Sequence, residues 1–169
     1  MQAMSSSEKV IEFIAELGLE HTVIECDPKY ADTQDFCQHY GYSLDESANV
    51  LLIASKKGEE KFAACVVLAN SRLDVNKVAR KKLGVSRISF AKPEQTKEQT
   101  GMELGGVTPF GLPAHIPIWI DARVMDCERI ILGGGDRASK VIMPPAELLK
   151  VPHSEVVENL ANPIPVAPE

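Results

Sequence analysis

The chain has 169 residues, of which 44% are hydrophobic and 25% charged, and its formal net charge is −6. This length and composition predict one globular domain with a sizeable core, and the acidic balance excludes a wholly basic nucleic-acid binder. No apolar run approaches the roughly 20 residues that span a bilayer, and no signal peptide is visible, so we expect a cytoplasmic protein without a membrane partner.

The N-terminal part of the chain predicts two helices and a strand. Ser5 and Glu8 have the spacing of a capping box, and apolar residues follow at helical intervals up to residue 17. A short strand is expected at 21–25. Thr33 is expected to cap a second helix that ends before Gly41.

Two apolar runs, at 49–55 and 61–69, predict a hairpin joined by the charged turn 56–60. A strand that is apolar along its whole length is usually covered on both faces. We therefore expect this hairpin to lie at the centre of the fold.

The segment after the hairpin is basic although the chain as a whole is acidic. A helix is expected from Asp74 to Gly84, and between positions 77 and 98 there are seven basic residues against two acidic ones. Such a surface can hold a phosphate backbone, but a solvated helix face is the more common case. The candidates for contacts with such a phosphate backbone, which lie off the apolar stripe, are Lys77, Arg80 and Lys81.

The remaining elements are short. A helix is expected from Pro93 to near Gly101, and further helices at 145–150 and at about 154–160. Strands are expected at 87–90, 116–121, 129–132 and 140–143. Together these elements predict an α+β fold with a mixed, mostly antiparallel sheet. We expect one domain over 1–160, followed by a Pro-rich tail over 161–169 that is extended or disordered.

Residues 100–113 contain four of the eleven glycines and two of the eleven prolines, with little charge. Glycine allows unusual backbone conformations and close approach, whereas proline stiffens the chain. This combination indicates a shaped loop rather than a flexible linker. Either it carries function or it is a long connection folded over the core.

A second glycine run, Gly133–Gly135, follows an expected strand and precedes Asp136. It could be a phosphate loop of a nucleotide or small-metabolite hydrolase, although the fingerprint is incomplete and glycine runs also form tight turns. Asp121 and Asp136 could be catalytic, or they could be turn and capping residues. The cysteines at 26, 37, 65 and 127 and the scattered histidines lack metal-ligand spacing, so we expect buried free thiols and no metal site.

Four segments, taken together and in order, resemble the YbaK/prolyl-tRNA synthetase editing-domain family over residues 8–151. They are LDVNKVARKKLG, EQTGMELGGVTPFGLP, IPIWIDARV and IILGGGDRASKVIMPPAELLK. The resemblance implies a barrel-like, mostly antiparallel sheet flanked by helices, and no metal or organic cofactor. It also implies a freestanding deacylase that removes the amino acid from mischarged tRNA in trans, with tRNA for proline as one candidate. The expected partners are the 3′ end of aminoacyl-tRNA and an aminoacyl-tRNA synthetase; the oligomeric state is open.

In this interpretation the glycine-rich loop binds the aminoacyl ester. The ester is already activated, so hydrolysis needs mainly positioning and polarisation of its carbonyl group. Gly105 and Gly106 are the catalytic candidates, through their backbone N–H groups. The substrate-binding candidates, from this loop and from the second glycine run, are Val107, Thr108, Pro109, Gly111, Gly133, Gly134, Gly135 and Asp136.

One position departs from the family pattern. Many active members carry a lysine at the start of the first hairpin strand, and the alignment of NVLLIA places Asn49 there. Asparagine keeps a hydrogen-bond donor but lacks the positive charge. Asn49 could orient a different substrate, the enzyme could depend on backbone groups and the substrate itself, or the chain could be a non-catalytic relative that binds tRNA or a synthetase.

Overall fold

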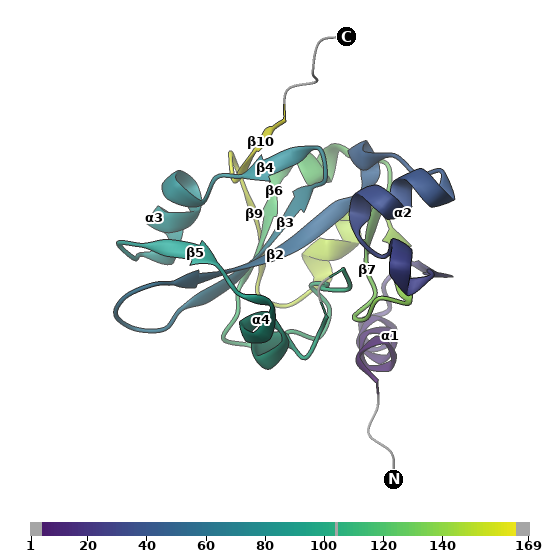
Figure 1. Cartoon of the computed structure of the whole chain (residues 1–169), viewed down its shortest axis with the longest axis horizontal. Helices are drawn as coiled ribbons and strands as arrows, with labels where there is room; N and C mark the ends of the chain where they lie inside the picture. Colours follow the sequence, from purple (N-terminus) through teal and green to yellow (C-terminus); the bar gives the residue numbers. More distant parts are fainter. Residues whose placement is uncertain (1–4, 104, 165–169) are drawn as a thin grey trace.

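The structure, a computed structural model, describes residues 5–103 and 105–164. Its centre is the antiparallel hairpin of β2 (Ala48–Ser55) and β3 (Phe62–Leu68), and every residue of β3 is buried. Strand β2 runs through the middle of the molecule (Figure 1). The expected central hairpin is therefore confirmed.

The hairpin belongs to a five-stranded sheet with the order β5-β2-β3-β6-β9. Its other strands are β5 (Ile88–Phe90), β6 (Ile118–Asp121) and β9 (Ser154–Val157). Strand β6 runs parallel to both β3 and β9, whereas β2 is antiparallel to β3 and β5. A short antiparallel pair, β4 (Ser71–Leu73) with β10 (Ala161–Pro163), lies apart from this sheet.

A second, antiparallel sheet has the order β1-β8-β7. It contains β1 (Thr22–Glu25), β7 (Ile130–Gly133) and β8 (Ser139–Met143). The two larger sheets meet at a parallel bridge between Ser47 and Ile131. The expected mixed α+β fold is confirmed, although none of the three sheets in the described residues closes into a barrel.

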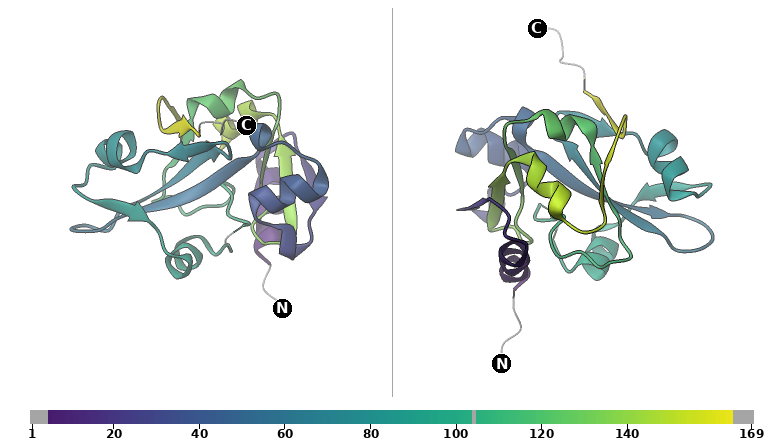
Figure 2. Two further views of the ribbon diagram at one scale, coloured as in Figure 1. Left: turned by 45° about the horizontal axis from the view of Figure 1, so that its top comes forward. Right: turned by 180° about the vertical axis from the view of Figure 1, so that it is seen from behind.

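The helices lie around these sheets. They are α1 (Ser6–Leu17), α2 (Thr33–Tyr40), α3 (Arg80–Leu83) and α4 (Pro93–Thr100). Helices α1 and α2 lie near the β1-β8-β7 sheet, and α3 lies beside β5 at the other end of the molecule (Figures 1 and 2). No helix in the described part of the chain is long and apolar enough to cross a membrane.

Short 3-10 and π turns connect the larger elements. The 3-10 turns are η1 (Pro28–Tyr30), η2 (Leu44–Glu46), η4 (Ala122–Asp126) and η5 (Pro145–Lys150). The helix expected after Asp74 begins instead with a π turn, η3 (Val75–Ala79), before α3 starts. Asp74 caps this turn, since its side chain accepts a hydrogen bond from the backbone N–H of Lys77.

One sequence expectation near the C-terminus and one near the N-terminus are wrong. Residues 154–160 do not form a helix, because Ser154–Val157 pairs with β6 as strand β9. The expected tail begins as β10, and its residues 165–169 lie outside the described residues. Thr33 is not the cap of α2: Asp32 has that position, and the Thr33 hydroxyl binds Asn49 instead.

The core has separate parts on the two faces of the hairpin. Alternate residues of β2 and β3, such as Val50 and Val66, contribute to the larger cluster, which also contains Val10 and Ile14 of α1. The other face, which includes Cys65, packs against the segment of η3 and α3. A third, smaller cluster lies under α2 and consists of Cys26, Ala31, Phe36, Cys37 and Ile131.

Candidate functional site

A cavity of about 270 Å³ lies where the two larger sheets meet. Its lining includes Asn49 from β2, Gly105 and Val107 from the first glycine-rich loop, Gly133 from β7 and Lys140 from β8. Helix α2 contributes residues of its N-terminal end. The fold thus brings the start of the hairpin and both glycine-rich segments, which are far apart in the sequence, to one cavity.

Asn49 is held at the cavity wall by Thr33. The Thr33 hydroxyl donates a hydrogen bond to the side-chain carbonyl oxygen of Asn49. The side-chain amide nitrogen of Asn49 has no hydrogen-bond partner among the described residues. Because Asn49 is half-buried and lines the cavity, this NH₂ group is a donor that a ligand can use.

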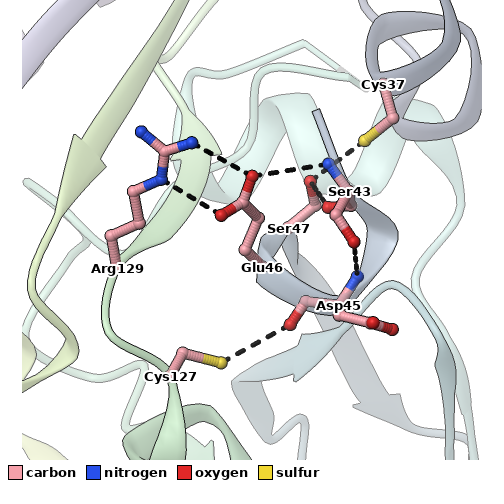
Figure 3. Close-up of polar contacts among 7 residues, drawn as sticks. All are labelled: Cys37, Ser43, Asp45, Glu46, Ser47, Cys127 and Arg129. Atoms are coloured by element: carbon pink, nitrogen blue, oxygen red, sulfur yellow. Dashed lines mark hydrogen bonds and ion pairs between the residues drawn. The ribbon is translucent and has the colours of Figure 1, made fainter. Parts of the chain in front are cut away.

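A polar network holds the residues that precede β2 in place (Figure 3). The Ser47 hydroxyl donates to the backbone oxygen of Ser43 at 3.1 Å and lies 3.1 Å from the Cys37 thiol of α2. The guanidinium of Arg129 donates two hydrogen bonds to the Glu46 carboxylate, at 3.0 and 3.2 Å. The hydrogen bonds from Arg129 lower the pKa of the Glu46 carboxyl. These contacts connect η2 to α2 and to the segment that precedes β7.

The two glycine runs pack backbone against backbone. The N–H of Gly135 donates to the carbonyl oxygen of Gly106 at 2.6 Å. A Cβ atom at Gly133 would lie 2.7 Å from the Gly106 carbonyl carbon and from the Val107 oxygen, which is closer than real Cβ contacts. Glycine is therefore required at Gly133 by close approach rather than by an unusual φ angle.

The backbone amides of the loop have different roles. The N–H of Gly106 donates to the carbonyl oxygen of Glu103 at 2.9 Å, so it is engaged within the turn. Gly105 has φ of 87° and lines the cavity together with Val107. The cavity wall consequently comes from Gly105 and Val107, and Gly106 supports it from behind.

Three other candidates in this loop lie away from the cavity lining. Thr108 is fully buried, and its hydroxyl oxygen has no hydrogen-bond partner among the described residues. Pro109 lines a separate hollow near Pro113. Gly111 has φ of 83° in an exposed turn. The latter half of the loop thus shapes the fold around the site rather than the cavity itself.

The second glycine run shows a similar division. Gly133 lines the cavity, whereas Gly134 packs against Ser139 and Gly135 packs against the first turns of α1. Asp136 accepts a hydrogen bond from the backbone N–H of Ala138 at 2.8 Å, as a turn aspartate does. Gly134, Gly135 and Asp136 therefore hold the turn between β7 and β8.

The basic candidates lie at a different end of the molecule. Lys77, Arg80 and Lys81 belong to η3 and α3, which lie beside β5 and far from α2 in each view (Figures 1 and 2). Lys77 and Lys81 are exposed, and Arg80 donates to the backbone oxygen of Asn76 at 3.0 Å. These side chains do not line the cavity.

Lys140 is a cavity residue that the sequence reasoning did not single out. Its side chain is 5% exposed, and its ammonium group donates to the backbone oxygens of Ala31 at 2.6 Å and Gly105 at 2.8 Å. Its Nζ also lies 5.4 Å from the centre of the Phe36 ring. Burial lowers the pKa of Lys140 below that of an ordinary lysine. The sequence feature that could have identified Lys140 is the presence of a lysine in an otherwise apolar strand.

The charges at the cavity favour an oxygen-rich ligand. Arg137 forms an ion pair with Asp32 at 3.0 Å and donates to the backbone oxygen of Pro28, next to α2. Among the described lining residues Lys140 is the cation and Asp32 the carboxylate, whereas Arg137 is connected to the lining through its ion pair with Asp32. No histidine or cysteine of the described residues lines the cavity. The arrangement suits positioning and polarisation of a carbonyl or phosphate oxygen better than attack by a protein nucleophile.

Comparison with known proteins gives matches along most of the chain. Residues 27–151 match the family model of the aminoacyl-tRNA editing domain. The uncharacterized protein YwhH of Bacillus subtilis is 31% identical over 138 residues, which cover 81% of this chain and 85% of that protein. The prolyl-tRNA editing protein ProX of Acetoanaerobium sticklandii is 22% identical over 152 residues, which cover 88% of this chain and 91% of ProX.

A solved structure shares the fold. It is that of a candidate trans-editing enzyme for prolyl-tRNA synthetase, with a TM-score of 0.78 and 23% sequence identity. The match covers 93% of this chain and 98% of that one. The overall arrangement of sheets and helices is thus common to both proteins.

Proposed function

Since the chain belongs to the aminoacyl-tRNA editing domain family, we propose that it hydrolyses the ester bond of mischarged aminoacyl-tRNA in trans. The observation that carries this proposal is the cavity between the sheets, which Asn49, Gly105 and Val107 line together and where the Asn49 oxygen is held by Thr33. Such a cavity can hold the aminoacyl group of a tRNA 3′ end. The basic residues Lys77, Arg80 and Lys81 remain candidates for contacts with a more distant part of the tRNA backbone.

The proposed reaction needs no nucleophile from the protein. A water molecule, oriented by protein groups or by the free hydroxyl of the terminal ribose, attacks the ester carbonyl carbon and gives up a proton, and the carbonyl oxygen becomes an oxyanion. The bond between this carbon and the ribose oxygen then breaks, and the ribose oxygen takes up a proton. Donors that bind the oxyanion more strongly than the neutral carbonyl lower the barrier, and removal of one such donor typically costs about 10²–10³ in rate.

The size of the cavity sets the proposed selectivity. A volume of about 270 Å³ admits a small aminoacyl group together with part of the ribose. Discrimination between side chains that differ by one methylene is worth only about 1–3 kcal/mol. The ProX relative is named for prolyl-tRNA editing, so tRNA for proline carrying a smaller amino acid is the first substrate to test.

A binding-only role is the second candidate. Asn49 lacks the charge of the lysine expected from the resemblance. The side-chain oxygen of Asn49 already accepts a hydrogen bond from Thr33. A protein of this kind binds charged tRNA or a synthetase without turnover. Filter binding of charged tRNA in the absence of deacylation would support this role over the enzymatic one.

A panel of tRNAs, each charged with a different small amino acid, tests the enzymatic proposal. The purified protein is expected to release the amino acid from at least one of them faster than buffer does. No release above background from any of them would overturn the proposal. The Asn49→Lys variant is the accompanying test, because activity gained only in this variant would show that the natural protein is a degenerate, binding-only relative.

A further inference from the structure

Lys140 is a buried cation without a counter-ion. Among the residues that the structure describes, no carboxylate forms an ion pair with its ammonium group. Removing an ammonium group from water costs several kcal/mol even after relaxation, and backbone carbonyl groups compensate for only part of this. A charge held at such a cost inside a cavity is typical of a functional site.

The hydrogen bonds of Lys140 leave part of its capacity unused. An ammonium group has three N–H donors, and Ala31 and Gly105 accept from two of them. The third has no acceptor among the described residues. Because Lys140 lines the cavity, this third donor is available to a ligand.

Lys140 and Asn49 come from different sheets. Asn49 is on β2, and Lys140 is on β8, where it pairs with Gly133 of β7. Both line the same cavity, so a ligand that fills it contacts both walls.

We propose that Lys140 is the substrate-binding cation of this cavity and donates its third N–H to the carbonyl oxygen of the aminoacyl ester. The identity of the ligand rests on the proposed function, whereas the site itself rests on the geometry of Lys140. The charge strengthens the interaction as the carbonyl oxygen becomes an oxyanion. It also repels the protonated α-amino group, which fixes the orientation of the aminoacyl group.

The competing explanation is a structural strap. Lys140 connects the segment before α2, through Ala31, to the glycine-rich loop, through Gly105. In that case the two backbone hydrogen bonds matter and the charge does not. The two explanations differ in what happens when the charge is removed but amide donors remain.

Two neutral variants separate these explanations. Lys140→Gln keeps two N–H donors without the charge, and Lys140→Met removes the donors as well. The probe is 3′-(alanylamino)-3′-deoxyadenosine, a stable amide analogue of an aminoacylated 3′ end, with binding measured by calorimetry at neutral pH. Both variants are expected to bind it at least about tenfold more weakly, as the loss of a charged hydrogen bond implies. Wild-type affinity in Lys140→Gln would establish the strap and overturn the proposal.

Two further measurements of analogue affinity should not change if Lys140 is only a structural strap. One moves the cation to another residue, and the other varies the pH. Asn49→Lys is expected to restore part of the lost affinity in the Lys140→Met background, and no recovery would count against the proposal. In the wild type, the affinity for the analogue should fall as the pH rises through a window that lies below the pKa range of an ordinary lysine. Lys140→Met, measured at the same pH values, is the reference and should not show this fall. The titratable and charged groups that face Lys140 are Cys26, Cys37, Asp32 and Arg137.

Controls separate failure of this inference from failure of the proposed function. Lys56→Met, in the exposed β2–β3 turn, should bind the analogue like the wild type. If the wild type deacylates tRNA and both Lys140 variants do so equally well, the inference fails and the function stands. If the wild type binds the analogue through Lys140 but releases no amino acid, the inference stands and the enzymatic function fails. If the wild type does not bind the analogue, the inference fails.

Discussion

Replacing Gly133 with alanine tests whether the packing of the two glycine runs shapes the cavity. The new Cβ atom would lie 2.7 Å from the carbonyl carbon of Gly106 and the oxygen of Val107, against 3.4 Å or more in ordinary contacts. These neighbours are backbone atoms, so no side-chain rotation relieves the clash. Gly133 is itself held by its pairing with Lys140 on β8. The glycine-rich loop must therefore move away from Gly133, and the part of the cavity wall that the loop forms moves with it.

The expected cost of Gly133→Ala follows from this geometry. Overpacking of this kind typically costs about 1–3 kcal/mol. Alanine recovers up to about 1 kcal/mol relative to glycine in a strand, so we expect a net loss of about 1–2 kcal/mol in the free energy of unfolding. Because a misplacement of about 1 Å can cost 10²-fold in activity, kcat/KM for deacylation should fall by at least about tenfold.

Chemical denaturation and deacylation kinetics together check this prediction. The control is Gly58→Ala in the β2–β3 turn, where φ is 79° and no other atom lies within 4 Å of the added Cβ. Backbone strain there costs about 1–2 kcal/mol but leaves the cavity intact. If Gly133→Ala loses stability but keeps the wild-type kcat/KM, the two glycine runs do not shape the site. If it loses neither, the packing argument is wrong.

Other substitutions test the neighbourhood of the site and the anchoring of the C-terminal strand. Thr33→Val removes the hydroxyl that binds Asn49 and should cost about 1 kcal/mol in stability, with several-fold weaker binding of the aminoacyl-adenosine analogue; unchanged affinity would show that Asn49 needs no support. Burial raises the pKa of Asp121, so the folded state binds more protons than the unfolded state above the ordinary aspartate range, and stability should fall as the pH rises through that window. Asp121→Asn should abolish this fall, and its free energy of unfolding at pH 7 should stay within about 1 kcal/mol of the wild type. Asp121→Ala also removes the acceptor for the N–H of Ala161 and should cost about 1–3 kcal/mol. Equal losses for the two variants in urea denaturation would contradict the argument.

The elements that the sequence predicted well are those set by local signals. Ser5 accepts from the N–H of Glu8 at 3.2 Å as the capping pattern requires, and Gly18 ends α1 with φ of 65°. The uninterrupted apolar runs likewise predicted the buried hairpin. The sequence predicts a helix where strand β9 forms, because Val156, Val157 and Leu160 fit a helical face as well as a strand. Pairing with β6 decides its conformation, and that contact is distant in sequence.

The candidate site could be predicted only in part, because it too depends on contacts between residues that are distant in the sequence. The glycine-rich segments stand out in the sequence, but their mutual packing through Gly106 and Gly133 depends on the fold. The sequence predicts a strand at Lys140 but no role for its side chain, because its partners are backbone oxygens of Ala31 and Gly105. A carbonyl oxygen carries no sequence signal. Side chains that bind backbone groups across the fold are therefore hidden until the fold is known.

The meeting of two separate sheets at the cavity has a consequence for how such a protein diversifies. Asn49 belongs to the five-stranded sheet, whereas Gly133 and Lys140 belong to the three-stranded one, and the bridge of Ser47 to Ile131 joins them. Each wall is thus stabilised by its own hydrogen-bonded partners. Mutations can remodel one wall while the other keeps its shape, so descendants can acquire new substrates through a few changes on one side and inherit the rest.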